Sequence, residues 1–111
     1  NHTGITLTPV IRKTLHFIHN NIFTKITLND ISSFCNVSSG YISKEFKRQT
    51  GINISEYIVR EKTKQAKIML LDDFTYSDIS YRLGFCSESH FIACFVKVEG
   101  ITPKKYKLQM L

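Results

Sequence analysis

Between residues 40 and 48 the sequence gathers cationic side chains around two apolar ones, a pattern that can bind anions. Lys44, Lys47 and Arg48 recur at helical spacing, with Ile42 before them and Phe46 among them. If Ile42 and Phe46 face a core, the cations lie on the other side of the helix. Such cations bind phosphates and the acceptor atoms of base edges. We interpret this segment as a polyanion-binding helix, with a solvated charged surface as the alternative.

Histidines and cysteines are the other residues that could do chemistry, but neither type is grouped. His16 and His19 lie three residues apart, as metal ligands can, yet no third ligand is evident. Cys35, Cys86 and Cys94 form an odd set without a CxxC pair, which argues against a disulfide framework and a zinc site. We interpret them as reduced core thiols in a cytoplasmic protein. We predict no catalytic residue, no metal and no cofactor.

Charge is distributed unevenly along the chain. The net charge is +6 over 111 residues. Residues 1–53, 54–71 and 72–111 hold six, four and five Lys or Arg against two, two and five acidic residues, which gives +4, +2 and 0. The first half is therefore expected to meet a polyanionic partner. No run approaches the roughly 18 apolar residues of a membrane helix and no secretion signal is visible, so no membrane partner is predicted.

The elements that must position these residues are predicted to be helices, because strand signals are poor throughout. Thr8 and Pro9 open a first helix over residues 8–22. Thr27 caps a second over 28–35, and Gly51 closes a third over about 39–49. The other expected helices cover about 55–71, a short stretch opened by Ser77 or Thr75, residues 88–98 before Gly100, and a last segment with Lys104, Lys105 and Lys107.

Two segments of the chain repeat each other. Asp30 and Ile31 recur 48 residues later as Asp78 and Ile79. With a shift of 49, the residues Ile42, Phe46, Gly51, Ile52 and Tyr57 recur as Phe91, Phe95, Gly100, Ile101 and Tyr106. A helical solenoid would need three or more units. Two copies of a short helix, a tight turn and a second helix therefore indicate two helix-turn-helix units, whose second helices suit the major groove of DNA.

The motifs "LNDISSFCNVSSGYISKEFKRQTG" and "YSDISYRLGFCSESHFIACFVKVEGITPKKY" carry a resemblance over about residues 8–108. In them the chain resembles the DNA-binding domain of AraC/XylS-type bacterial transcription regulators. The resemblance implies an all-α domain of about seven helices, with two helix-turn-helix subdomains, 1–53 and 72–111, joined by a long central helix over 54–71. It also implies sequence-specific binding of double-stranded DNA, with the two second helices in successive major grooves, for transcription regulation. Its implied further partners are RNA polymerase and an effector or dimerisation domain outside this chain.

In the first unit, the family's base-reading positions fall on Gly40, Ser43 and Lys44. Gly40 allows close backbone approach, Ser43 can bond a base edge, and Lys44 can reach the acceptors of guanine. Lys44 stands where the family commonly has Arg, so a point charge replaces a bidentate fork. The expected phosphate contacts of this helix are Tyr41, Lys47 and Arg48.

In the second unit, the corresponding positions fall on Glu88, Ser89, His90, Ile92 and Ala93. Ala93 replaces a usual Arg and Val96 a usual Lys, so the first unit is expected to dominate readout. Ile92 and Ala93 can still touch a thymine methyl group. Glu88 or Ser89 can accept a hydrogen bond from cytosine N4, and His90 can bond an acceptor atom of a base. Alternatively, Ile92 and Val96 form an apolar patch that meets a protein.

Further phosphate contacts are expected where helix starts offer backbone donors, at Thr27 and Thr75, and at Lys97 and Lys104. For Lys104, Lys105 and Lys107 simple solvation is the alternative. Two other functions stay open at this stage. One is a DNA-repair methyl acceptor, which would need an activated cysteine thiolate. The other is an architectural or protein-interaction module that binds DNA by charge alone.

Overall fold

The computed structural model describes residues 7–111, and within this range every regular element is an α-helix. Residues 1–6 of the predicted first subdomain lie outside the described residues. The seven helices of the described range are α1 (Pro9–Asn20), α2 (Leu28–Cys35), α3 (Ser39–Thr50), α4 (Ile54–Leu71), α5 (Tyr76–Arg82), α6 (Glu88–Glu99) and α7 (Pro103–Met110). The predicted all-α architecture with a long central helix is confirmed.

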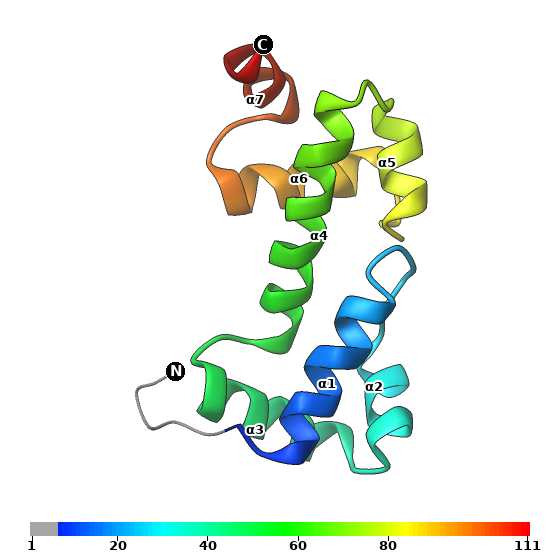
Figure 1. The fold of residues 1–111 in the computed structure, drawn as a ribbon, viewed down its shortest axis with the longest axis vertical. Coiled ribbons are helices and arrows are strands. Elements are labelled where there is room, and N and C mark those ends of the chain that lie inside the picture. Colours follow the sequence, from blue (N-terminus) through cyan, green and yellow to red (C-terminus); the bar gives the residue numbers. More distant parts are fainter. Residues whose placement is uncertain (1–6) are drawn as a thin grey trace.

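Helix α4 joins two groups of helices that lie at its opposite ends (Figure 1). Helices α1, α2 and α3 pack on one another near its start, and α5, α6 and α7 pack around its second half. In Figure 1 both α3 and α6 cross the direction of α4. With 18 residues, α4 spans about 27 Å at 1.5 Å per residue. The molecule is correspondingly elongated, with extents of 41 × 30 × 19 Å.

The helix starts follow from their capping residues. Thr8 is the N-cap of α1 and Pro9 its first residue, as predicted. The hydroxyl of Thr27 accepts from the Asp30 N–H at 3.1 Å, while the Asp30 carboxylate accepts from the Thr27 N–H at 3.0 Å. Thr75 caps α5 through its hydroxyl alone, which accepts from the Asp78 N–H at 3.0 Å. Of the two expected openings of α5, Thr75 is therefore the observed one.

The helix ends explain the small differences from the predicted bounds. Helices α3 and α6 both stop at a left-handed glycine, Gly51 at φ +85° and Gly100 at +81°. Each runs one residue beyond its predicted end, and α4 begins at Ile54 rather than at residue 55. Helix α1 ends at Asn20, two residues early, because the backbone leaves the helical conformation at Asn21, where φ is −118°, and the Asn21 side-chain amide donates to the Phe17 carbonyl at 2.8 Å.

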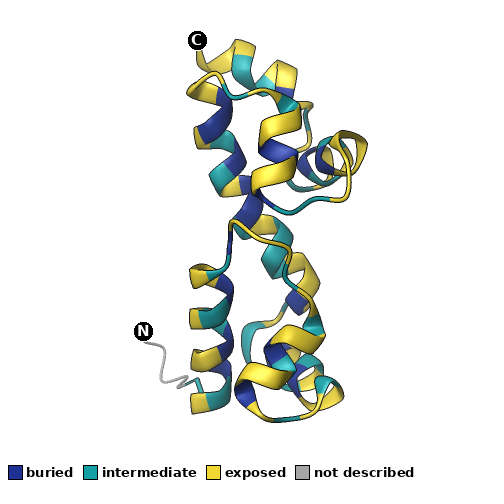
Figure 2. Cartoon of the chain, turned by 90° about the vertical axis from the view of Figure 1, so that its right-hand side faces the viewer, coloured by how far each residue is buried: buried dark blue, intermediate teal, exposed yellow. Residues whose placement is uncertain are grey.

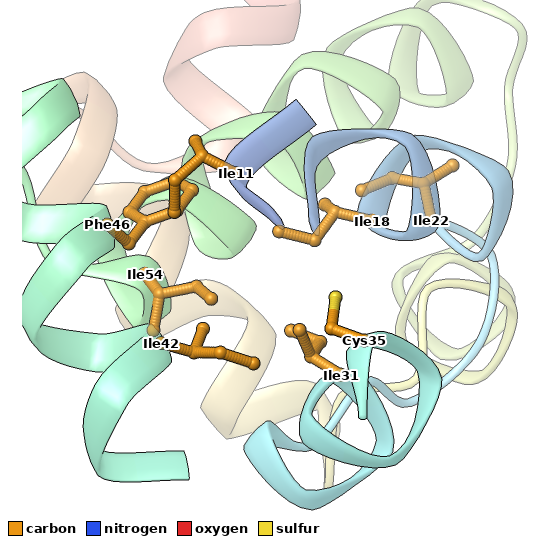
Figure 3. Close-up of a cluster of buried hydrophobic side chains, with 8 residues drawn as sticks. All are labelled: Ile11, Ile18, Ile22, Ile31, Cys35, Ile42, Phe46 and Ile54. Carbon is orange, nitrogen blue, oxygen red and sulfur yellow. The ribbon is translucent and has the colours of Figure 1, made fainter. Parts of the chain in front are cut away.

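Buried apolar side chains form two separate clusters. The first is formed around α1, α2 and α3 and is drawn in Figure 3: Ile11, Ile18, Ile22, Ile31, Cys35, Ile42, Phe46 and Ile54. The second belongs to the other end of α4: Ala66, Met69, Leu70, Ile79, Leu83, Phe91 and Phe95. Figure 2 shows buried residues in both halves of the chain. Each fully buried large side chain contributes about 1.5 to 3 kcal/mol, so each helix group has its own source of stability.

Candidate nucleic-acid interface

Helix α3 separates its apolar and cationic residues onto opposite sides. Ile42 and Phe46 are fully buried in the first cluster, whereas Lys44, Lys47 and Arg48 are exposed. Neither Lys44 nor Arg48 is buried. Residues near the N-terminal end of α3 are also accessible to a partner: Gly40 and Tyr41 are exposed and Ser43 is half-buried.

Gly40 lies next to open space. A Cβ atom built at this residue would meet no atom of the chain within 4 Å. Internal packing therefore does not require glycine at this place. The missing side chain of Gly40 instead allows the backbone of a partner to approach α3 closely.

The three cations of α3 differ in their partners. Arg48 forms a two-pronged ion pair with Glu45, in which Nη2 lies 2.6 Å from Oε1 and Nε lies 3.1 Å from both carboxylate oxygens. Lys47 Nζ donates to the Gly51 carbonyl at 3.2 Å, at the C-terminal end of the helix. Within residues 7–111, the Lys44 side chain has no hydrogen bond or ion pair. Of the three, Lys44 is therefore the cation most available for an external anion.

Glu45 was not singled out from the sequence, although its position three residues before Arg48 is a recognisable signal for a helical ion pair. Hydrogen bonds from Arg48, and then from Gln49, lower the pKa of Glu45 to about 2. The same pair raises the pKa of Arg48. Gln49 also donates to Thr8 Oγ1 at 3.0 Å, which links the network to the start of α1. A phosphate that recruits Arg48 must compete with this carboxylate.

Helix α6 is built on the same plan but exposes few cations. Phe91 and Phe95 are buried in the second cluster. On the other side Glu88, Ser89, His90 and Ala93 are exposed and Ile92 is half-buried. Val96 is 37% exposed, so it belongs to an accessible apolar surface with Ile92. Lys97 is the exposed cation of this helix.

His90 is held against the turn that precedes α6. Its Nδ1 atom accepts from the Cys86 N–H at 3.3 Å, and its ring meets Phe85 edge to face with centroids 5.5 Å apart. An imidazole that accepts at Nδ1 carries its proton on Nε2. His90 therefore presents Nε2 as a donor, which matches an acceptor atom on a partner.

The candidate phosphate contacts outside α3 lie in contrasting surroundings. At Thr27 the capping box already engages the hydroxyl and the N–H, and it places the Asp30 carboxylate at the helix start. At Thr75 only the hydroxyl bond to the Asp78 N–H is formed. Lys104 is exposed at the start of α7, as is Lys105. Lys107 instead pairs with Asp73 at 2.7 Å.

The cysteines do not all lie in the core. Cys35 is buried, Cys94 is half-buried and Cys86 is exposed. The interpretation of three core thiols is therefore wrong for Cys86, because this residue lies in the irregular turn between α5 and α6. Burial raises the pKa of Cys94, which disfavours its thiolate.

The two histidines of α1 have polar partners of their own. His16 Nε2 lies 2.8 Å from Asn20 Nδ2. His19 Nε2 lies 2.8 Å from the Tyr57 hydroxyl and 3.4 Å from the Glu61 carboxylate. Across residues 7–111, no three His, Cys, Asp or Glu side chains gather as a metal site would require. In the same range, no helix is both long and apolar enough to cross a membrane.

Fold and surface together define a tandem helix-turn-helix domain. Helices α2 and α3 form one unit, α5 and α6 form the other, and α4 carries both. A helix-turn-helix domain family matches residues 31–109. The chain belongs to this family, in its AraC type.

Relatives and solved structures agree with this assignment. The uncharacterized HTH-type transcriptional regulator YtdP of Bacillus subtilis is 34% identical over 96 residues, which cover 86% of this chain and 12% of YtdP. The chain thus spans a minor part of that relative. The C-terminal domain of AraT, a response regulator from Geobacillus stearothermophilus, superposes with a TM-score of 0.88 at 26% identity, over 93% of this chain and 87% of that domain. The DNA-binding domain of the global transcriptional factor AdpA, solved in complex with a target DNA, shares the fold with a TM-score of 0.81 at 17% identity, over 91% of each chain.

Proposed function

We propose that this domain binds double-stranded DNA sequence-specifically to regulate transcription, without catalysis, in the bacterial cytoplasm. In this proposal residues 1–53 and 72–111 act as two subdomains on the connecting helix 54–71, and α3 and α6 enter successive major grooves. The observation that carries it is the exposed Lys44, which lies on α3 opposite two fully buried residues and has no ion pair within residues 7–111. Support for the partner comes from the AdpA domain, which shares the fold and was solved with DNA.

The two helices contribute unequally in this proposal. On α3, Gly40, Ser43 and Lys44 read base edges, while Tyr41, Lys47 and Arg48 hold phosphates. On α6, the side chains proposed to face bases are shorter or uncharged, apart from Glu88, so they discriminate more weakly. The residues proposed to contact bases there are Glu88, Ser89, His90, Ile92 and Ala93. Phosphate contacts at Thr27, Thr75, Lys97 and Lys104 complete the proposed interface.

Selection of bound sequences from a random DNA library tests this proposal directly. Sequence-specific binding predicts an enriched site with two half-sites about one helical turn apart. The half-site read by α3 should carry more information than the one read by α6. Equal affinity for enriched and random duplexes at physiological salt would instead support binding by charge alone.

RNA polymerase and an effector or dimerisation domain are the further partners that we propose for the whole protein. Because the chain spans 12% of YtdP, such a domain would belong to other parts of a longer protein. The half-exposed surface of Ile92 and Val96 on α6 favours a protein contact as a second candidate function for that helix. Retained DNA affinity after Val96→Lys, together with loss of activation in a reporter assay, would support the protein contact.

A methyl-acceptor function is disfavoured by the thiols. Cys35 is buried and the pKa of Cys94 is raised by burial, so neither is an activated nucleophile. Cys86 is the exposed thiol, and the structure offers it no metal cluster among residues 7–111. Mass spectrometry after incubation with methylated DNA tests this, because a stable methyl adduct on Cys86 would overturn the non-enzyme proposal.

A further inference from the structure

Besides their connection through α4, the first unit, counted with α1 and the loop that follows it, contacts the second unit, counted with α7. The loop after α1, residues 21–27, reaches the end of α5, as Figure 1 shows for the blue loop below the yellow helix. Beside this place lies an open groove of about 830 Å³, bordered by Phe23 and Lys25 from the first unit and by Tyr81 and Phe85 from the second. Apolar packing therefore does not fill the space between the units.

Lys62 of α4 lies at this meeting point and is only 5% exposed. Its ammonium donates to the Ile22 carbonyl at 2.8 Å, to the Thr24 carbonyl at 2.6 Å and to the Leu83 carbonyl. The first two acceptors belong to the first unit and the third belongs to the second unit. All three protons of the ammonium are thus used, and each one bonds a backbone atom.

The position of these carbonyls explains why a cation is suited to the site. Leu83 is the C-cap of α5, whereas Ile22 and Thr24 lie in the loop beyond the C-cap of α1. A carbonyl at the C-terminal end of a helix lacks an intrahelical donor and carries partial negative charge, as Leu83 does here. The end of α5 and the loop after α1 therefore converge on one buried ammonium, and their carbonyls replace part of the water that Lys62 loses.

Gly84 provides a second, independent contact at the same place. It has φ +75°, and a Cβ atom there would lie 2.6 Å from the carbonyl carbon of Thr24 and in collision with the backbone of Lys25. Backbone atoms cannot move aside as a flexible side chain can. The turn before α6 and the loop after α1 are thus in direct backbone contact, which only glycine permits.

We propose that Lys62 and Gly84 form a joint that fixes the orientation of the two helix-turn-helix units and thereby positions α3 and α6 for simultaneous binding. Lys62 acts here as a positioning residue, because its ammonium is fully engaged inside the protein. This role cannot be predicted from the sequence, because the acceptors of Lys62 are distant along the chain. Leu83 lies about 20 residues away, and Ile22 and Thr24 lie about 40 residues away. The link to two-site recognition rests on the proposed DNA binding, whereas the joint itself does not.

Two pairs of variants test the joint. Lys62→Met removes the three donors and keeps an unbranched side chain, and Lys64→Met changes an exposed lysine of the same helix as its control. Gly84→Ala introduces the clash, and Gly100→Ala is its control because Gly100 has a similar φ of +81° with open space around it. Both alanine variants place a side chain at a similar positive φ, so the clash is the main difference between them.

The first measurement uses no DNA. Residual dipolar couplings and amide relaxation of the wild-type protein should give one alignment tensor and one tumbling time for both units. In Lys62→Met or Gly84→Ala the two units should give different tensors, while the control variants should behave as the wild type. Independent tumbling of the units in the wild type would overturn the proposal. If Lys62→Met fails to fold, Gly84→Ala and the wild-type relaxation data still decide.

The second measurement uses the DNA found by library selection. Loss of the joint should leave affinity for the α3 half-site alone within about twofold and weaken binding to the full site about tenfold or more, since simultaneous binding depends on geometry. One inserted base pair between the half-sites should weaken the wild type more than the variants. Equal weakening on the half-site and the full site would contradict positioning. Absence of specific binding by the wild type would refute the proposed function and leave the first measurement as the test of the joint.

Discussion

Single residues decide how much of the positive charge on α3 is free to act. Lys44 has no ion pair within residues 7–111, Lys47 bonds the end of its own helix, and Arg48 is engaged by Glu45. The charge count of the sequence treats these three cations alike. The structure ranks them by their availability, with Lys44 first.

Lys44→Ala should therefore weaken specific DNA binding by about 1 to 3 kcal/mol, the usual size of a base contact, and relax specificity at one base pair. Stability should change little because the side chain is exposed and unpaired. Fluorescence anisotropy on the selected site and on its single-base variants measures both effects. Lys64→Ala, which removes an exposed lysine of α4, is the control. Uniform weakening on all the duplexes would assign Lys44 to a phosphate instead.

Glu45→Gln should strengthen DNA binding, because it releases Arg48 from its carboxylate. If the freed guanidinium then binds one more phosphate, the slope of log affinity against log salt should steepen by about 0.9. Glu56→Gln makes the same charge change on α4, where Glu56 pairs with Arg60 at 3.8 Å, and serves as the control. The same gain in both variants would indicate a general effect of net charge rather than the release of Arg48.

The Glu45 pair also predicts a response to acid. Hydrogen bonds from Arg48 and Gln49 lower the pKa of Glu45 to about 2 from an ordinary value of 4.5. A carboxyl group with a lowered pKa stabilises the fold above its ordinary pKa and loses this contribution as pH falls through the folded-state value. Between about pH 4.5 and 2 the wild type should thus lose more stability than Glu45→Gln. Urea unfolding at several pH values measures this, and parallel curves would contradict it.

At the scale of elements, α6 differs from α3 in what it exposes rather than in how it folds. Both helices have a serine N-cap, two buried residues four apart and a left-handed glycine at the end. Ala93→Arg restores a long cation on the exposed side of α6 and should tighten binding or narrow sequence preference at the second half-site. Library selection with the variant measures the preference, and Ala93→Met controls for side-chain length. Unchanged selection would mean that α6 does not enter the groove in this register.

The sequence was sufficient to predict most helix bounds because capping chemistry is local. Thr27 and Asp30 fix the start of α2, and Gly51 and Gly100 mark the ends of α3 and α6. The end of α1 was misjudged because Ile22 is buried although it lies beyond the helix. Apolar periodicity reports burial, and burial can continue into a loop.

The sequence predicted which residues of the candidate site are exposed and which are buried, but it did not predict the contacts between side chains and distant segments. Opposite placement of apolar and cationic residues on α3 follows from helical spacing alone. The burial of Lys62 does not, because its acceptors come from two distant segments that meet only in the folded chain. Cys86 was assigned to the core, but it lies in an exposed turn. A turn has no helical periodicity from which the burial of a residue could be predicted.

At the scale of the whole molecule, two cores share one helix. The first cluster ends on α4 with Ile54 and the second begins with Ala66, so no buried apolar residue belongs to both. The polar joint at Lys62 and the continuous backbone of α4 are then the main connections between the units. Such an arrangement couples the units less strongly than a shared apolar core would.

A cavity in one of the two apolar clusters should therefore destabilise the unit that contains it more than the other unit. Phe46→Ala leaves a cavity in the first cluster, which destabilises a core by about 3 to 5 kcal/mol for this substitution. Amide protection should fall across α1, α2 and α3 and persist in α5, α6 and α7. Phe95→Ala is the mirror variant and should give the opposite pattern. Hydrogen exchange followed by NMR resolves each amide. Equal loss of protection in both units from either variant would show that the joint and α4 make the domain a single cooperative unit, and would rule out independent cores.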